Sequence, residues 1–301
     1  MSLSGNLAMA LLRRIKPGKG SFSDLEKLRQ RARRENEGFT LRMPKHREAE
    51  CVLLPDTALP CMVVQPGRMT DPGKAILYLY GGVTNHWNTQ RSMAVRYAVD
   101  AGVTLWYPVY PSISEACVTE GLAYLAEIYR RMLEQYDGAK IALSGVSMGG
   151  FYALELINWI NHEGTDLPMP GLLLAHSPGG VPDDEADWAA FRGYEARDPM
   201  FAEGDLRMTE RLMPCDGPWP LWALSPARGD FTGAPPTYLY YGEEMLAGNA
   251  GLYRRAYERG GAGERLHVTI ERNMMHGYSC MPVFPESRRV YRETVRLIQE
   301  L

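Results

Sequence analysis

Cysteine is scarce in this sequence, and the few cysteines follow no pattern. Their number is odd and none belongs to a CxxC pair, which disfavours both a disulfide framework and a zinc site. The five are Cys51, Cys61, Cys117, Cys215 and Cys280. The scatter predicts free thiols in a reducing compartment, so we expect a cytoplasmic protein with no metal site.

Long hydrophobic runs are also missing. The longest apolar run near the start, "LAMALL" at 7–12, is far shorter than a membrane span, and its basic flank "RRIKPGK" follows it instead of preceding it. We therefore expect no integral membrane segment. The alternative for this stretch is a short amphipathic segment that lies over a pocket or touches a membrane surface.

Charge of either sign is not in marked excess. The chain has 33 basic and 36 acidic residues, a formal net charge of -3, which gives no reason to expect nucleic acid or an anionic membrane as a partner. Apolar residues make up 45% of the 301 residues and charged residues 23%, as in folded globular proteins. With no repeat and no linker-like stretch, one domain with a small-molecule partner is expected.

What the chain does contain is a regular alternation of apolar runs and helical periods. A helix opened by a Ser23–Glu26 capping box precedes a hairpin-like region at 48–64. Runs of strand length follow at 74–80, 103–109, 140–145, 171–177, 236–242 and 265–271. Helical periods fall near 90–101, 115–133, 247–260 and from about 285, and a further helix carries Ala153, Leu156, Ile157 and Ile160 on one face. Strands that are apolar throughout and are joined by helices indicate a mainly parallel sheet covered on both faces.

The stretch "KIALSGVSMGGFYALEL" (140–156) contains a G-x-S-x-G motif between an expected strand and an expected helix. Glycines at 145 and 149 remove side chains that would crowd an abrupt turn, which leaves the Ser147 hydroxyl exposed at the carboxyl edge of the sheet. This context favours Ser147 as a nucleophile, with a helix N-cap as the alternative.

A serine hydroxyl needs a base, and that base needs a carboxylate to orient it. His276, in "RNMMHGYSC", follows the last strand and precedes Gly277, which makes it the best base; His176 is interpreted as a core or rim histidine. The acid is expected between serine and histidine in the chain. "YYGEEML" offers Glu244, which we prefer, and Glu243, which stays open.

The oxyanion formed during acyl transfer needs N–H donors. One donor is expected from Met148, directly after the nucleophile, and the other from the loop "YGGVTNHW" that follows the 74–80 strand. Gly81, His86 and Trp87 of that loop are the candidate substrate contacts.

Taken together in this order, the motifs "YLYGGV", "GVSMGG", "SPARGDFTGAPPTYLYYGEE" and "MMHGY" resemble the hormone-sensitive-lipase-like branch of α/β-hydrolase esterases. The resemblance covers roughly residues 50–300. It implies a serine carboxylester hydrolase for small or medium acyl esters, without metal or cofactor, that acts through an acyl-enzyme intermediate. It also implies an α/β-hydrolase domain at 46–301 with a helical cap, formed by N-terminal helices at 1–45 and an insertion at 178–226.

The chain departs from that family in its oxyanion loop, where Val83 occupies the position of a third glycine. Losing one donor would cost about 2.7–4 kcal/mol of transition-state stabilisation, whereas backbone strain costs of order 1–3 kcal/mol. We therefore expect strain at Val83, with the Gly82 and Val83 amides kept as donors.

Two other functions stay open. The loop "YGGVTNHW" is also similar to the His-Gly-Gly-x-Trp of arylformamidases, which cleave an N-formyl amide with the same triad. Some members of this fold bind small molecules without catalysis, although here all three triad residue types are present. The sequence also leaves open a homodimer.

Overall fold

The computed structural model describes residues 2–15, 24–83, 90–113, 116–163, 166–212, 220–280 and 282–301. Its centre is one eight-stranded sheet with the strand order β1-β2-β4-β3-β5-β6-β7-β8. The strands are β1 (Ala49–Leu53), β2 (Cys61–Pro66), β3 (Ala75–Leu79), β4 (Thr104–Pro108), β5 (Ile141–Val146), β6 (Leu172–His176), β7 (Thr237–Gly242) and β8 (Leu266–Glu271). The expected α/β-hydrolase architecture is confirmed.

Six of these strands run parallel, and two pair antiparallel at one edge. β3 to β8 form the parallel part, while β2 is antiparallel to both β1 and β4. The register pairs Val146 with His176 and His176 with Tyr240, so the carboxyl ends of β5, β6 and β7 lie side by side. β3, β4, β5 and β6 are buried along their whole length, which explains why their sequences are apolar throughout.

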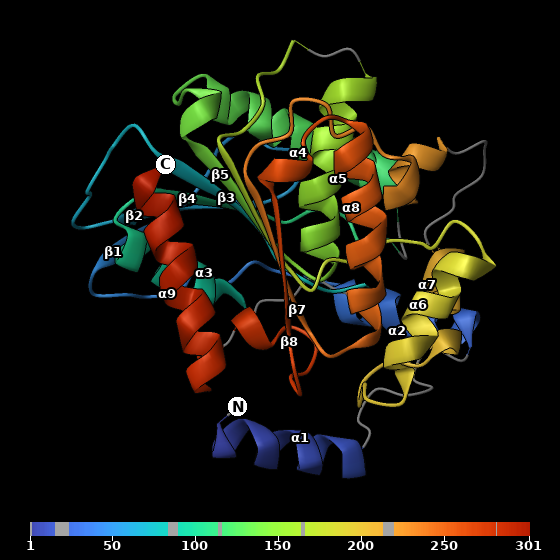
Figure 1. The fold of residues 1–301 in the computed structure, drawn as a ribbon. Coiled ribbons are helices and arrows are strands. Elements are labelled where there is room, and N and C mark those ends of the chain that lie inside the picture. Colours follow the sequence, from blue (N-terminus) through green and yellow to red (C-terminus); the bar gives the residue numbers. More distant parts are fainter. Residues whose placement is uncertain are drawn as a thin grey trace.

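Helices cover both faces of this sheet. The helices are α1 (Leu3–Ile15), α2 (Leu25–Asn36), α3 (Arg91–Ala101), α4 (Val118–Leu133), α5 (Met148–His162), α6 (Glu185–Glu195), α7 (Glu203–Leu212), α8 (Asn249–Arg259) and α9 (Pro285–Glu300). α3 and α9 pack together on one face, and α4, α5 and α8 lie on the other (Figure 1). α6 and α7 fall between β6 and β7, within the stretch where the alternation of the sequence breaks.

The structure corrects two expectations about local chemistry. The N-cap of α2 is Asp24, whose carboxylate accepts a hydrogen bond from the Lys27 amide at 3.1 Å, so the helix does not begin with the expected capping box. Cys117 is disulfide-bonded, whereas Cys51, Cys61 and Cys280 are free thiols. The prediction that all cysteines are free thiols, as in a reducing cytosol, is therefore wrong for Cys117. Among the described residues, no helix is both long enough and apolar enough to cross a membrane.

Close backbone packing explains the two glycines of the strand-to-helix turn. A Cβ at Gly145 would lie 2.2 Å from the Gly149 carbonyl oxygen, and a Cβ at Gly149 would lie 2.1 Å from the Leu79 carbonyl oxygen. The glycines thus let α5 begin directly against β3 and β5. This close packing demands glycine at both positions more strictly than the exposure of the serine hydroxyl does.

We expect Gly149→Ala to destabilise the protein by about 1–3 kcal/mol, because only a backbone shift can make room for the new methyl group. Urea unfolding followed by circular dichroism measures this change. Gly193→Ala is the matched control, since a Cβ there meets nothing within 4 Å and the residue lies inside α6, where alanine is favoured. Equal stability of the two variants would contradict the packing explanation.

Candidate active site

Ser147 occupies the turn between β5 and α5 with a strained backbone. Its φ is 53° and its ψ is -117°, a conformation that L-residues rarely adopt. The turn is held by a hydrogen bond of 2.7 Å from the Ser147 amide to the His176 carbonyl at the end of β6. The side chain therefore projects from the carboxyl edge of the sheet, as expected for a nucleophile.

Glu244 lies just beyond β7 and its side chain has no exposed surface. One carboxylate oxygen, Oε1, accepts hydrogen bonds from the Gly242 amide at 3.2 Å and from the Ser177 hydroxyl. The other, Oε2, lies 2.5 Å from Nδ1 of His276. The structure thus brings Glu244 to the histidine.

Glu243, the alternative acid, turns the other way. Its carboxylate pairs with Arg197 at 2.8 Å and accepts a hydrogen bond from the Asn273 amide at 3.1 Å. Its own amide donates to the Met274 carbonyl at 2.9 Å, which fixes the loop after β7 to the loop after β8. Glu243 therefore joins these loops instead of contacting the imidazole.

Ser177 binds both the Glu244 carboxylate and the loop of His276. It follows β6 with a φ of 49°, and its hydroxyl accepts a hydrogen bond of 2.9 Å from the Gly277 amide while it donates to Glu244. Since the neighbouring His176 carbonyl binds the Ser147 amide, residues 176–177 lie between Ser147 and His276. The Ser147 hydroxyl and the His276 imidazole form no hydrogen bond in this structure.

Two carboxylates act on His276. Burial alone would lower the pKa of this imidazole, but the charge and hydrogen bond of Glu244 and the charge of Asp198 hold the pKa above its ordinary value. Asp198 is itself 2% exposed and accepts hydrogen bonds from the amides of Met200, Phe201 and Met245. Burial and the nearby charge of Glu244 raise the pKa of Asp198.

Asp198 also places an aromatic ring against the base. The turn at 198–201 carries Phe201, whose ring meets the His276 ring edge to face at a centroid distance of 5.0 Å. Because the Asp198 carboxylate binds both this turn and the amide of Met245, the segment between α6 and α7 is joined directly to the loop that carries Glu244.

The loop after β3 lies beside the nucleophile. A Cβ at Gly81 would be 3.0 Å from Cβ of Ser147, so only glycine permits this approach. Gln90 holds the loop by accepting from the Gly81 amide at 2.9 Å, and Ser112 donates to the Val83 carbonyl at 3.0 Å. The prediction of backbone strain at Val83 is wrong. The positive φ in this loop, 138°, belongs to Gly82, and the φ of Val83 is not positive.

The three expected oxyanion donors are available. In the described part of the chain, the amides of Gly82, Val83 and Met148 donate no hydrogen bond to another protein atom. Gly82 and Val83 follow β3 and Met148 begins α5, the helix whose positive end points to this edge of the sheet. The arrangement can stabilise a negative oxygen next to Ser147.

Three further candidates from the sequence are His86, Trp87 and His176. His86 and Trp87 lie outside the described residues. His176 is fully buried against Tyr240, and burial lowers its pKa to about 4, in agreement with a core histidine. No group of three or more residues suited to hold a metal occurs in the described ranges.

Three residues that support the cluster were missed from the sequence: Ser177, Asp198 and Gln90. Ser177 directly follows an apolar strand, a position that could have been recognised because strand ends gather at one edge of the sheet. Asp198 and Gln90 had no comparable signal, since each acts through a segment whose path is set by tertiary packing.

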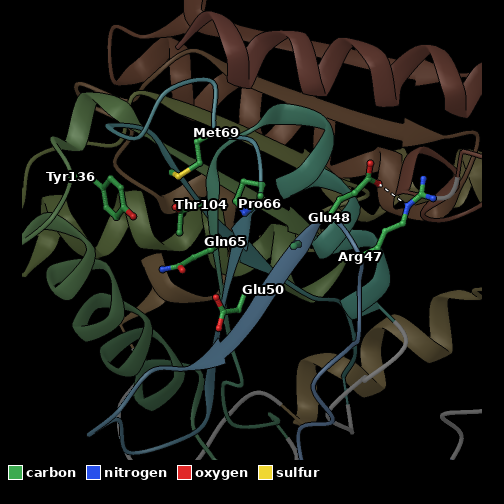
Figure 2. Close-up of a pocket in the computed structure, with 10 residues that line it drawn as sticks. Arg47, Glu48, Glu50, Gln65, Pro66, Met69, Thr104 and Tyr136 are labelled. Atoms are coloured by element: carbon green, nitrogen blue, oxygen red, sulfur yellow. Dashed lines mark ion pairs between the residues drawn. The ribbon is translucent and has the colours of Figure 1, made fainter.

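A separate hollow of about 630 Å³ lies at the opposite edge of the sheet. Figure 2 shows Gln65 and Pro66 from the end of β2 beside Thr104, with the Arg47–Glu48 ion pair at its rim. Thr104 is the first residue of parallel β4, whereas Ser147 follows the last residue of parallel β5. This hollow therefore does not adjoin the cluster around Ser147.

The fold is that of an α/β hydrolase. A family defined by the α/β-hydrolase fold matches residues 76–280, and the chain belongs to that family. An acetyl-hydrolase from Streptomyces hygroscopicus is 30% identical over 237 residues, which cover 75% of this chain and 75% of that protein.

Solved structures of esterases share the whole fold. An esterase from the bacterial hormone-sensitive lipase family superposes with a TM-score of 0.77 at 21% identity, over 100% of this chain and 98% of that one. An esterase/lipase from an uncultured bacterium gives a TM-score of 0.79 at 22% identity, over 100% of both chains. The likeness to hormone-sensitive-lipase-like esterases expected from the sequence is thereby confirmed.

The contact between Asp198 and the loop of Glu244 predicts a change in the titration of His276. We expect Asp198→Asn to lower the pKa of His276, because a negative charge that favours the imidazolium is removed. NMR titration of the ring resonances measures the shift, and thermal unfolding checks the fold. Asp183→Asn is the control, since Asp183 lies in the same segment but pairs with Arg228 at 2.6 Å. An unchanged or higher pKa in Asp198→Asn would contradict the role given to this carboxylate.

Proposed function

We propose that the protein is a serine carboxylester hydrolase that acts through a Ser147–His276–Glu244 triad. The observation that carries the proposal is the 2.5 Å contact between His276 and a carboxylate with no exposed surface, at the same edge of the sheet as a serine on a strained strand-to-helix turn. The Glu244 carboxylate accepts a hydrogen bond from Nδ1 of His276. Nε2 of the same imidazole is therefore the atom left to receive a proton.

In the first step, the Ser147 oxygen attacks the ester carbonyl while Nε2 of His276 accepts its proton. The buried charge of Glu244 stabilises the imidazolium that forms. The amides of Gly82, Val83 and Met148 bind the oxyanion of the tetrahedral intermediate. When this intermediate collapses, the imidazolium gives its proton to the departing alkoxide oxygen, and the alcohol leaves.

In the second step, water attacks the acyl-enzyme. Nε2 of His276 takes one proton from the water, the same amides bind the second oxyanion, and the proton returns to the Ser147 oxygen as the carboxylic acid leaves. Every proton transfer in both steps uses one nitrogen, which requires the imidazole to keep its orientation. The hydrogen bonds from Gly277 to Ser177 and from Ser177 to Glu244 support that orientation.

We assign the N-terminal helices at 1–45 and the 178–226 insertion to a cap over this site. Two contacts support the assignment: Phe201 packs on the ring of His276, and Asp198 binds the amide of Met245. A cap of this kind limits the space for the acyl group. Together with the acetyl-hydrolase from Streptomyces hygroscopicus, this favours small or medium acyl esters over the N-formyl amides of arylformamidases.

Ser147→Ala is expected to lower ester hydrolysis by about 10⁴-fold or more, because the nucleophile is lost while the fold is kept. Hydrolysis of p-nitrophenyl acetate measures the loss. Ser144→Ala is the matched control: Ser144 lies in β5, the strand that precedes Ser147, is buried, and its hydroxyl has no hydrogen-bond partner. Near-normal turnover by Ser147→Ala would end the proposal, and failure of an organophosphate to label the wild type would favour a non-catalytic binding protein.

A series of p-nitrophenyl esters from acetate to palmitate tests the acyl range. We expect kcat/KM to be highest among the short and medium chains and to fall for the longest, because the cap limits the acyl pocket. N-formyl aryl amines are compared in the same assay. A maximum at palmitate would contradict the acyl range, and preference for the N-formyl amide would contradict the ester specificity.

A further inference from the structure

The outward face of α1 carries a continuous stripe of aliphatic side chains. Leu3, Leu7, Leu11 and Ile15 recur every four residues and are 90%, 74%, 57% and 59% exposed. Residues at this spacing lie on one side of a helix. Isolated exposed leucines are common in proteins, but an aligned row of four over the whole length of a helix marks a surface for docking.

The inward face of the same helix is firmly attached. Gly5 and Met9 are buried, and a Cβ at Gly5 would lie 2.5 Å from Cε of Met274. Asn273 donates a hydrogen bond of 2.6 Å to the side chain of Asn6, and Ser2 binds Glu286 at 2.8 Å. The apolar stripe is therefore held outward by specific contacts on the opposite side of the helix.

Charge on this helix is of one sign. α1 contains no acidic residue and ends with Arg13 and Arg14, and α1 and α2 together carry seven basic and two acidic residues. The chain as a whole has a formal net charge of -3. A helix with aliphatic residues on one face and arginines at its end has the composition of helices that lie in the interface of an anionic membrane.

We propose that α1 docks the protein on an anionic lipid surface, with the stripe Leu3, Leu7, Leu11 and Ile15 in the acyl boundary and Arg14 at the headgroups. Arg13 donates a hydrogen bond of 3.2 Å to the Arg197 carbonyl and so stays attached to the protein. A 13-residue helix is about 20 Å long, too short to span the roughly 30 Å hydrocarbon core, so it lies along the interface. α1 has no acidic residue that could pair with the arginines of a second copy, which argues against a second copy as the occupant.

Docking in this way sets the orientation of the molecule. α1 lies at the lower margin of Figure 1, beyond the end of β8, and contacts the loop that leads to His276. The bound protein therefore turns the carboxyl edge of its sheet, with Ser147 and His276, toward the lipid. This inference rests on α1 alone and does not require the proposed esterase activity.

Flotation of the full chain with lipid vesicles tests the proposal. We expect binding to vesicles of equal parts phosphatidylcholine and phosphatidylglycerol, weaker binding to phosphatidylcholine alone, and weakening by added salt, since Arg14 acts through a screened charge. Leu7→Gln with Leu11→Gln should lower the partition coefficient at least about tenfold. Leu221→Gln, which changes a leucine 54% exposed elsewhere on the surface, should leave it unchanged.

Several results would overturn the proposal. In the first, the wild type does not float with anionic vesicles. In the second, the double variant floats as well as the wild type. In the third, the wild type is a dimer that binds no lipid, and the double variant is a monomer. The thermal midpoint is measured on each variant and should match that of the wild type, because Leu7 and Leu11 are exposed.

Discussion

A buried carboxylate determines how the carboxyl edge of this sheet is assembled. Burying an ionised group costs several kcal/mol unless hydrogen bonds and charge partners replace its water. Glu244 obtains these partners from three segments: the Gly242 amide in its own loop, the Ser177 hydroxyl after β6, and the His276 imidazole after β8. Satisfying one charge therefore fixes three loops relative to one another, and the position of the imidazole follows from that requirement.

Backbone strain at this edge is tied to the same network. Ser147 and Ser177 both have positive φ, a conformation that costs of order 1–3 kcal/mol for each non-glycine residue. They follow the adjacent parallel strands β5 and β6, and the Ser147 amide is bound to the His176 carbonyl. The two strained residues thus support each other, one presenting a hydroxyl outward and the other binding Glu244 and the loop of His276.

The sheet could be predicted from sequence because most of its parallel strands are short apolar runs. The order Ser147, Glu244, His276 along the chain was recognisable because each of these residues comes after a parallel strand. Three features depended on contacts far apart in the sequence. Asp198 reaches the loop of Glu244 from an irregular segment, Gln90 holds Gly81 from the start of α3, and the strain of the oxyanion loop falls on Gly82 instead of Val83. Composition and periodicity do not carry such information.

Net charge is a sum over the whole surface, whereas a partner senses only the charges within about a Debye length, roughly 10 Å. The excess of basic residues in α1 and α2 is hidden in that sum by acidic residues elsewhere. For a partner of α1, the local charge is the relevant quantity. The inner face of this helix contacts Asn273 and Met274, which are close to His276 in the chain. A partner held by the outer face of this helix is therefore held at the catalytic edge, whatever the total charge of the protein.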